Sequence, residues 1–188
     1  MSRITLPGTA RVSSHMDFLL PFPDFPSNAR CFVNLDARLL PYWHTLFDVC
    51  PGLLKLDPPD GLNLFRNFMK WAYRNHPPLN WAYHLSVCRW LLGSVYKAHI
   101  NAEHIESFMV AAAARWIHTD DSQAQGIVVV WQPLSMKVFD WKVAPGSLTG
   151  AEAEEDEFPP APWDFAWCPL ARQGSAGFRR WLPVFGHS

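Results

Sequence analysis

The sequence predicts a mixed α+β protein, a single domain in which several helices surround a small sheet. Three observations predict this class. Apolar residues recur at steps of three and four in several segments, two apolar runs have the composition of strands, and 49% of the 188 residues are hydrophobic. A chain of this length buries enough apolar surface for one domain and is short for two.

The charge balance and the cysteine spacing indicate what the protein can bind and whether its thiols are paired. The chain carries 16 basic and 17 acidic residues, and five of the acids lie in the run Glu152–Glu157. Without that run, 16 basic residues face 12 acidic ones, so the remainder has a net charge of +4 and can contact phosphates. Four scattered cysteines without a C-x-x-C pair predict free thiols.

The N-terminal residues lack the apolar block of a signal peptide, and no run reaches about 18 apolar residues. We therefore expect a cytoplasmic protein without a transmembrane segment. Peripheral attachment to the inner membrane through exposed aromatic side chains is the alternative.

Four regions divide the chain. Residues 1–28 form an irregular arm, because alternating prolines forbid a helix there. Residues 29–146 form the body. Residues 147–162 are an acidic and proline-rich linker. Residues 163–188 are an irregular, aromatic-rich tail that we expect to dock on the body.

The first elements of the body are a strand, a helix and a turn. Residues 30–35 have the pattern of a strand. Asp36 begins a helix, where its carboxylate caps free N–H groups; metal binding or catalysis is the alternative role. Pro51-Gly52 ends this helix, and residues 57–61 form a turn that contains a capping residue.

The helix expected over residues 62–75 has the clearest pattern in the chain. Arg66, Lys70 and Arg74 lie along one side of it, together with two asparagines. A line of cations flanked by aromatic residues can follow a nucleic-acid backbone, so we predict DNA contact here; a solvated helix face is the alternative. The opposite, buried side consists of Leu62, Phe65, Phe68, Met69 and Ala72.

A further helix begins near His84, after a short predicted strand at residues 79–83. His84, Ser86 and Arg89 cluster at its beginning. Backbone N–H groups and the helix dipole attract anions there, and a guanidinium adds a planar charged group. We predict a phosphate site; a solvated arginine is the alternative. The predicted buried stripe is Leu85, Cys88, Leu91, Leu92 and Val95.

The remaining elements are an extended piece, a helix and a hairpin. Residues 97–100 are expected to be extended, and Asn101 caps a helix over residues 102–118. Residues 126–131 and 136–143 have strand composition, and the short connection between them predicts a hairpin.

Carboxylates raise two further hypotheses. Glu103, Glu106, Asp120 and Asp121 lie at the ends of the helix just described, where they either hold Mg²⁺ or complement the helix ends, so no metal ligand is assigned. The run Glu152–Glu157 either competes with DNA for the basic helix face or is a solvated linker.

Three features together resemble the ParB/sulfiredoxin superfamily. They are a strand that leads into an Asp-started helix over residues 32–40, the polar helix start with Cys88-Arg89, and Ile100, eleven residues after the arginine. Members of that superfamily open a helix with a turn that cradles nucleotide phosphates. The resemblance implies plasmid fertility inhibition, by an ATPase and DNase that stops a type IV secretion system from exporting conjugative transfer DNA.

The resemblance also implies roles for single residues. Ser86, Cys88 and Arg89 would bind ATP, which would act with Mg²⁺. The catalytic groups would be Arg89, which offsets phosphate charge, and His84, which carries the proton.

Two other functions stay open. A non-enzymatic inhibitor would bind a secretion ATPase or coupling protein through an aromatic patch, and a structural accessory domain is the third hypothesis. Arg179 and Arg180, next to Trp181, are a second candidate for DNA contact.

Overall fold

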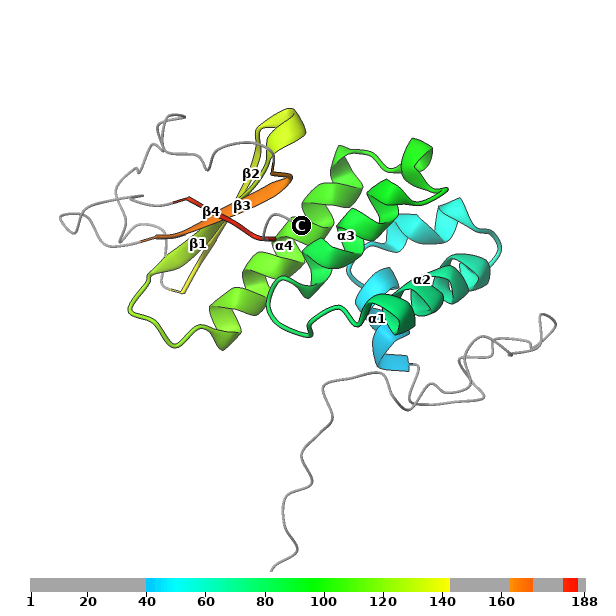
Figure 1. The fold of residues 1–188 in the computed structure, drawn as a ribbon, viewed down its shortest axis with the longest axis horizontal. Coiled ribbons are helices and arrows are strands. Elements are labelled where there is room, and N and C mark those ends of the chain that lie inside the picture. Colours follow the sequence, from blue (N-terminus) through cyan, green and yellow to red (C-terminus); the bar gives the residue numbers. More distant parts are fainter. Residues whose placement is uncertain (1–39, 143–162, 171–180, 186–188) are drawn as a thin grey trace, which may run out of the picture.

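The computed structural model describes residues 40–142, 163–170 and 181–185, and the statements below concern these residues (Figure 1). Helices on one side of a four-stranded antiparallel sheet confirm the mixed α+β class. The helices are α1 (Leu40–Phe47), η4 (Pro51–Leu56), α2 (Leu62–Asn75), α3 (Tyr83–Gly93), η5 (Lys97–His99), α4 (Ala102–Thr119) and η6 (Gln132–Leu134), where η marks 3₁₀ turns. The strands are β1 (Gly126–Trp131), β2 (Met136–Trp141), β3 (Phe165–Leu170) and β4 (Leu182–Pro183).

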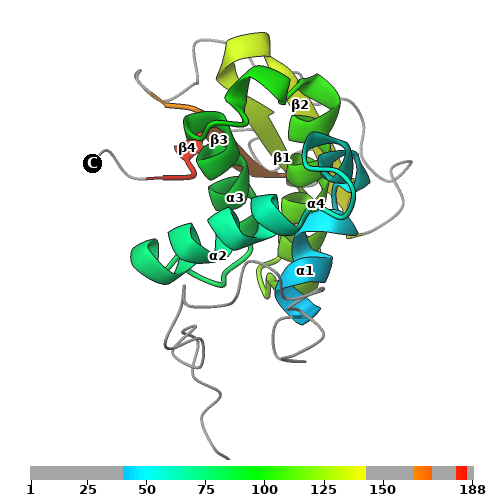
Figure 2. The ribbon, with the colours of Figure 1, turned by 90° about the vertical axis from the view of Figure 1, so that its right-hand side faces the viewer.

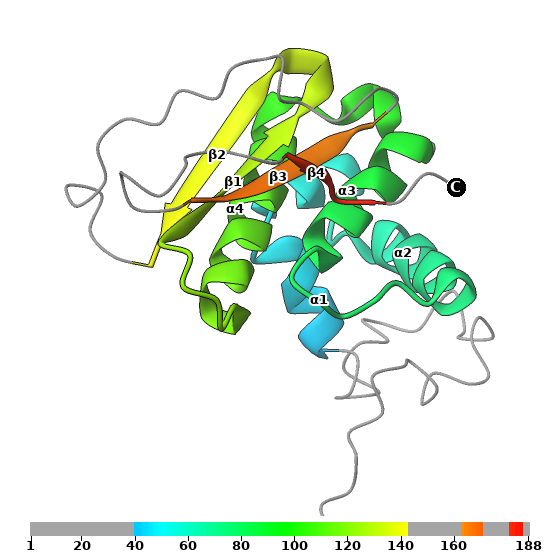
Figure 3. The ribbon, with the colours of Figure 1, turned by 60° about the vertical axis from the view of Figure 1, so that its left-hand side comes forward.

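The sheet has the strand order β2-β1-β3-β4, and all neighbouring strands are antiparallel (Figure 3). Strands β1 and β2 form the predicted hairpin, in which Gly126 faces Trp141. On its other side β1 pairs with β3, so that Val128 faces Cys168. The position of β1 between two strands, with both of its faces buried, explains its continuous run of apolar residues.

The two faces of the sheet carry separate clusters of apolar side chains. Ile127, Val129 and Val138 belong to the main core, which the helices complete (Figures 1 and 2). Helix α4 lies directly on the sheet and α3 packs against α4, while α2 and α1 lie further out. The opposite face carries a smaller cluster of Val128, Val130, Ala166, Cys168, Leu170 and Trp181.

Helix α2 confirms its predicted bounds, Leu62 and Asn75. Two carboxylates of the preceding turn satisfy N–H groups at its start. Asp57 Oδ2 accepts a hydrogen bond from Leu64 N at 2.9 Å, and Asp60 Oδ1 accepts one from Leu62 N at 3.2 Å. The predicted buried side is confirmed except at its first position, where Leu64 is buried and Leu62 is half-buried.

Helix α4 begins at its predicted cap. Asn101 Oδ1 accepts a hydrogen bond from His104 N at 3.0 Å, and His104 Nδ1 accepts one from Asn101 N at 3.2 Å, which forms a reciprocal capping box. The stripe from Ile105 to Trp116 is buried as expected. No helix within the described ranges is long and apolar enough to cross a bilayer.

Three local predictions are wrong for identifiable reasons. Residues 79–83 form no strand, because a turn at Asn80 leads directly into α3. Val95 is 83% exposed, because α3 ends at Gly93, before the stripe reaches it. Residues 97–99 form a 3₁₀ turn instead of an extended piece.

Strand β3 lies inside the sheet, although the sequence analysis assigns no strand to the tail. Its six residues pair with β1 along their whole length. The predicted strand over residues 30–35, the cap at Asp36 and the boundaries after residues 28, 146 and 162 lie outside the described residues.

We expect the substitution Asn101→Ala to lower the free energy of unfolding by about 1 kcal/mol, because it removes one half of the capping box. Urea denaturation of the purified protein measures this change. Gln132→Ala, at an exposed position of η6, is the control and should change stability by less than about 0.5 kcal/mol. Equal stability of Asn101→Ala and the control would contradict the capping role.

Candidate functional site

The beginning of α3 does not present the free N–H groups that the predicted phosphate site requires. Asn80 Oδ1 accepts a hydrogen bond from Ala82 N at 3.0 Å, and Asn80 O accepts one from Tyr83 N at 3.2 Å. The carbonyl of Ala82 accepts bonds from Leu85 N and Ser86 N at 3.0 and 3.1 Å. The preceding turn and the helix itself therefore use four of the donors that an anion would need.

His84 and Cys88 point into the interior. His84 is 9% exposed and Cys88 is fully buried. Burial, followed by the charge of Arg115, lowers the pKa of His84 to about 4, and its Nδ1 has no hydrogen-bond partner among the described residues. Burial, followed by the charge of Asp164, raises the pKa of Cys88 to about 12. Both side chains are therefore uncharged at neutral pH.

Arg89 leaves α3 on its accessible side and contacts the C-terminal part of the chain. Its Nε lies 2.6 Å from Asp164 Oδ2, just before β3. Its guanidinium carbon lies 4.4 Å from the centre of the Phe185 ring, just after β4. The Arg89 side chain is 46% exposed and that of Asp164 is 35% exposed, so this ion pair lies at the surface.

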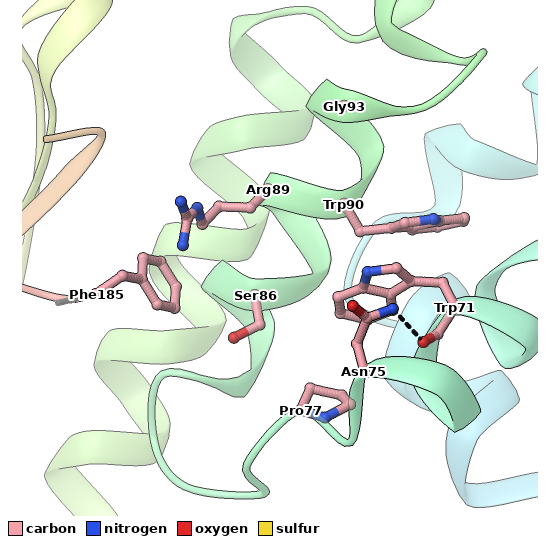
Figure 4. Close-up of a pocket in the computed structure, with 8 residues that line it drawn as sticks. All are labelled: Trp71, Asn75, Pro77, Ser86, Arg89, Trp90, Gly93 and Phe185. Atoms are coloured by element: carbon pink, nitrogen blue, oxygen red, sulfur yellow. Dashed lines mark hydrogen bonds between the residues drawn. The ribbon is translucent and has the colours of Figure 1, made fainter. Parts of the chain in front are cut away.

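A groove of about 460 Å³ lies beside Arg89, between the end of α2, the outer side of α3 and Phe185, two residues after β4 (Figure 4). Trp71 and Trp90 form one wall, with stacked rings whose centres are 5.8 Å apart. Asn75 Nδ2 donates to Trp71 O at 2.8 Å, which fixes the amide beside this wall. The residues that line the groove are Trp71, Asn75, Pro77, Ser86, Arg89, Trp90, Gly93 and Phe185.

The structure brings together some of the predicted site residues and separates others. Ser86 and Arg89 line the groove, whereas His84 and Cys88 lie in the core. On α2, Lys70 and Arg74 are exposed and Arg66 is half-buried. Arg179 and Arg180 lie outside the described residues, and DNA contact at any of these cations stays a prediction.

Trp71 was expected only to flank a nucleic-acid contact of its helix, and no prediction assigned Trp90 to a site. Trp71 follows Lys70 directly and Trp90 follows Arg89 directly, so two Trp residues next to cations on neighbouring helices were the available signal. Asp164 and Phe185 carried no local signal, because they reach Arg89 through the pairing of β3 with β1 and β4.

The carboxylates at the ends of α4, weighed above as magnesium ligands or as charges that complement the helix ends, form no metal-binding group in the described part of the chain. Asp120 Oδ2 accepts hydrogen bonds from Lys142 Nζ and from Ser122 N. Within the ranges that the structure describes, no three His, Cys, Asp or Glu side chains form a group that could hold a metal ion.

The fold and the groove define a class: a small mixed α+β protein with an aromatic and cationic surface groove beside a buried helix. Comparison with family models identifies the family within this class. The model described as "Methanobactin biosynthesis cassette protein MbnC-like" matches residues 22–185. The match covers most of the chain, so the chain belongs to the MbnC-like family. Comparison with curated proteins gives no match.

This assignment overturns the resemblance to the ParB/sulfiredoxin superfamily. Fertility inhibition is wrong as the function, as are the ATPase and DNase acting on transfer DNA and the alternative inhibitor of a secretion ATPase. The predicted roles in plasmid conjugation and type IV secretion are wrong for the same reason. ATP and Mg²⁺ followed from the resemblance and lose that support.

The structure explains why the resemblance was misleading. Residues 32–39 lie outside the described part of the chain. The Cys88-Arg89 pair has a packing role, because the thiol fills the core while the guanidinium pairs with Asp164.

We expect the stability of the protein to fall between pH 6.5 and pH 4. Unfolding raises the pKa of His84 from about 4 to its ordinary value near 6.5, so the unfolded state binds more protons in this window. The loss is at most about 1.4 kcal/mol per pH unit. Urea titrations at pH 7, 6 and 5 measure it, and His84→Asn should flatten the dependence. An unchanged slope in that variant would contradict the assignment to His84.

Proposed function

We propose that the chain is a binding component of methanobactin biosynthesis that holds another component of that process in the groove beside Arg89. The family assignment supports the biosynthetic role. The observation that carries the binding role is the groove itself, which combines a stacked Trp pair, a half-exposed guanidinium and a fixed amide at one accessible place.

This combination has the chemistry of protein and peptide recognition. Tryptophan and arginine dominate the binding energy of many interfaces, because they offer large contact areas together with directional polar groups. The groove volume of about 460 Å³ lies in the range of well-formed ligand sites, about 300–1,000 Å³. It accommodates a few side chains of a bound segment.

The placement of His84 and Cys88 supports binding over catalysis by those two residues. A general acid or base works best with a pKa near the operating pH, and a cysteine nucleophile acts as its thiolate. The pKa of His84 is about 4 and that of Cys88 is about 12. Neither side chain lines the groove.

We propose that the protein carries out this binding function in the cytoplasm. Support comes from Cys50 and Cys88, which are buried free thiols and suit a reducing compartment.

Gly93 offers a clean way to test the groove. A Cβ added there meets nothing within 4 Å, so a larger side chain can enter the groove without disturbing the core. In a strain that carries the biosynthesis cassette, we expect Gly93→Phe to reduce methanobactin production roughly tenfold or more, the effect of about 1.4 kcal/mol of lost binding free energy.

Gly93→Ala is the matched control for this test. It adds a helix-favouring residue at the same position and should retain both production and stability. Soluble yield and urea denaturation of both variants verify folding. Normal production with a well-expressed Gly93→Phe protein would overturn the proposed function of the groove.

A further inference from the structure

Seven of the eight residues that line the groove come from a segment without acidic residues. None of the residues between Asp60 and Glu103 is acidic, and five of them are Lys or Arg. This segment contains α2, α3 and η5. The carboxylate nearest to Arg89 among the described residues comes from elsewhere in the chain, since Asp164 precedes β3.

Two exposed cations of α2 are next in sequence to residues that line the groove. Lys70 precedes Trp71 and Arg74 precedes Asn75, so the two cations form an i, i+4 pair next to the two α2 residues that line the groove. Both cations are exposed. Neither cation lines the groove itself, but both add positive charge to the exposed surface of α2, next in sequence to residues that do.

Arg89 supplies positive charge on the α3 side. A guanidinium has five N–H donors, and the described contact with Asp164 is made by Nε. The Phe185 ring lies against the guanidinium and orients it, and the side chain is half-exposed. The Nη groups can therefore donate to a second carboxylate at the groove.

We propose that the groove binds an acidic segment of a partner protein, in which an aromatic or proline side chain lies on the Trp71–Trp90 wall. Carboxylates of that segment lie beside Lys70, Arg74 and Arg89. This inference rests on the proposed function and names the chemistry of the ligand. Charge complementarity between these cations and an acidic segment makes binding fast and dependent on salt.

Charge and geometry favour a peptide over nucleic acid. The whole chain has a formal charge of −1; Arg89 lines the groove, and Lys70 and Arg74 are exposed on α2. Proteins that bind DNA tightly neutralise more phosphates than these cations can, typically about 6–10. Trp71 and Trp90 stack on each other, whereas single-stranded nucleic acid requires separate aromatic side chains on which successive bases stack.

Fluorescence anisotropy with two labelled peptides tests the proposal. The probe is Glu-Glu-Phe-Pro-Glu-Glu, and the matched neutral peptide is Gln-Gln-Phe-Pro-Gln-Gln. The full chain should bind the acidic peptide at least about fivefold more tightly at low salt, and the preference should shrink as salt rises. Equal affinity for the two peptides would overturn the proposal.

Charge variants locate the contact. Gly93→Glu should weaken binding of the acidic peptide by roughly three- to tenfold relative to Gly93→Gln, because the two side chains have the same size and differ in charge. Lys70→Glu should have a similar effect. Lys137→Glu, on a strand that contributes no residue to the groove, should leave the affinity unchanged. An equal loss in the Lys137 variant would overturn the assignment to the groove.

Two further experiments distinguish an acidic peptide from nucleic acid as the ligand, and failure of this inference from failure of the proposed function. Single-stranded dT12 that displaces the acidic peptide at equal concentration would overturn the proposal in favour of nucleic acid. Loss of methanobactin production in Gly93→Phe, without any preference for the acidic peptide, would overturn the acidic ligand and leave the proposed function in place. Normal production in Gly93→Phe would overturn the proposed function.

Discussion

Burial of the first half of α3 is the constraint on which the site depends. Every residue from Tyr83 to Cys88 is at most 9% exposed, because α4 packs on one side of the helix and the main core surrounds it. A helix that is apolar on all sides belongs in an interior. His84 therefore loses contact with solvent, and the residues of α3 that line the groove are Ser86, Arg89, Trp90 and Gly93.

The ion pair between Arg89 and Asp164 connects this helix to the end of the chain. An ion pair at the surface contributes little to stability, typically below about 1 kcal/mol. Its importance lies in position, since it fixes the guanidinium beside the groove and against the Phe185 ring. Residues 96 positions apart in the sequence thus form one surface.

Local patterns predicted the elements that local interactions determine. Helix α2 follows from its apolar periodicity, α4 from its Asn101 cap, and β1 from its run of valines. The site could not be predicted in the same way. Whether Ser86 and His84 face solvent depends on the placement of α4 and β3, and Asp164 meets Arg89 through strand pairing between distant segments. A Cys-Arg dipeptide can belong to a phosphate-binding turn or to a packed helix. The sequence alone does not distinguish the two, and the resemblance built on Cys88-Arg89 therefore favoured the wrong family.

Site-specific photocrosslinking in cells that produce methanobactin tests the central claim most directly. A benzoylphenylalanine placed at Asn75, in the groove, should crosslink to a product of the biosynthesis cassette. The same group at Val110, which is 48% exposed on α4 and does not line the groove, should not crosslink to it. Crosslinking from Val110 without crosslinking from Asn75 would contradict the account.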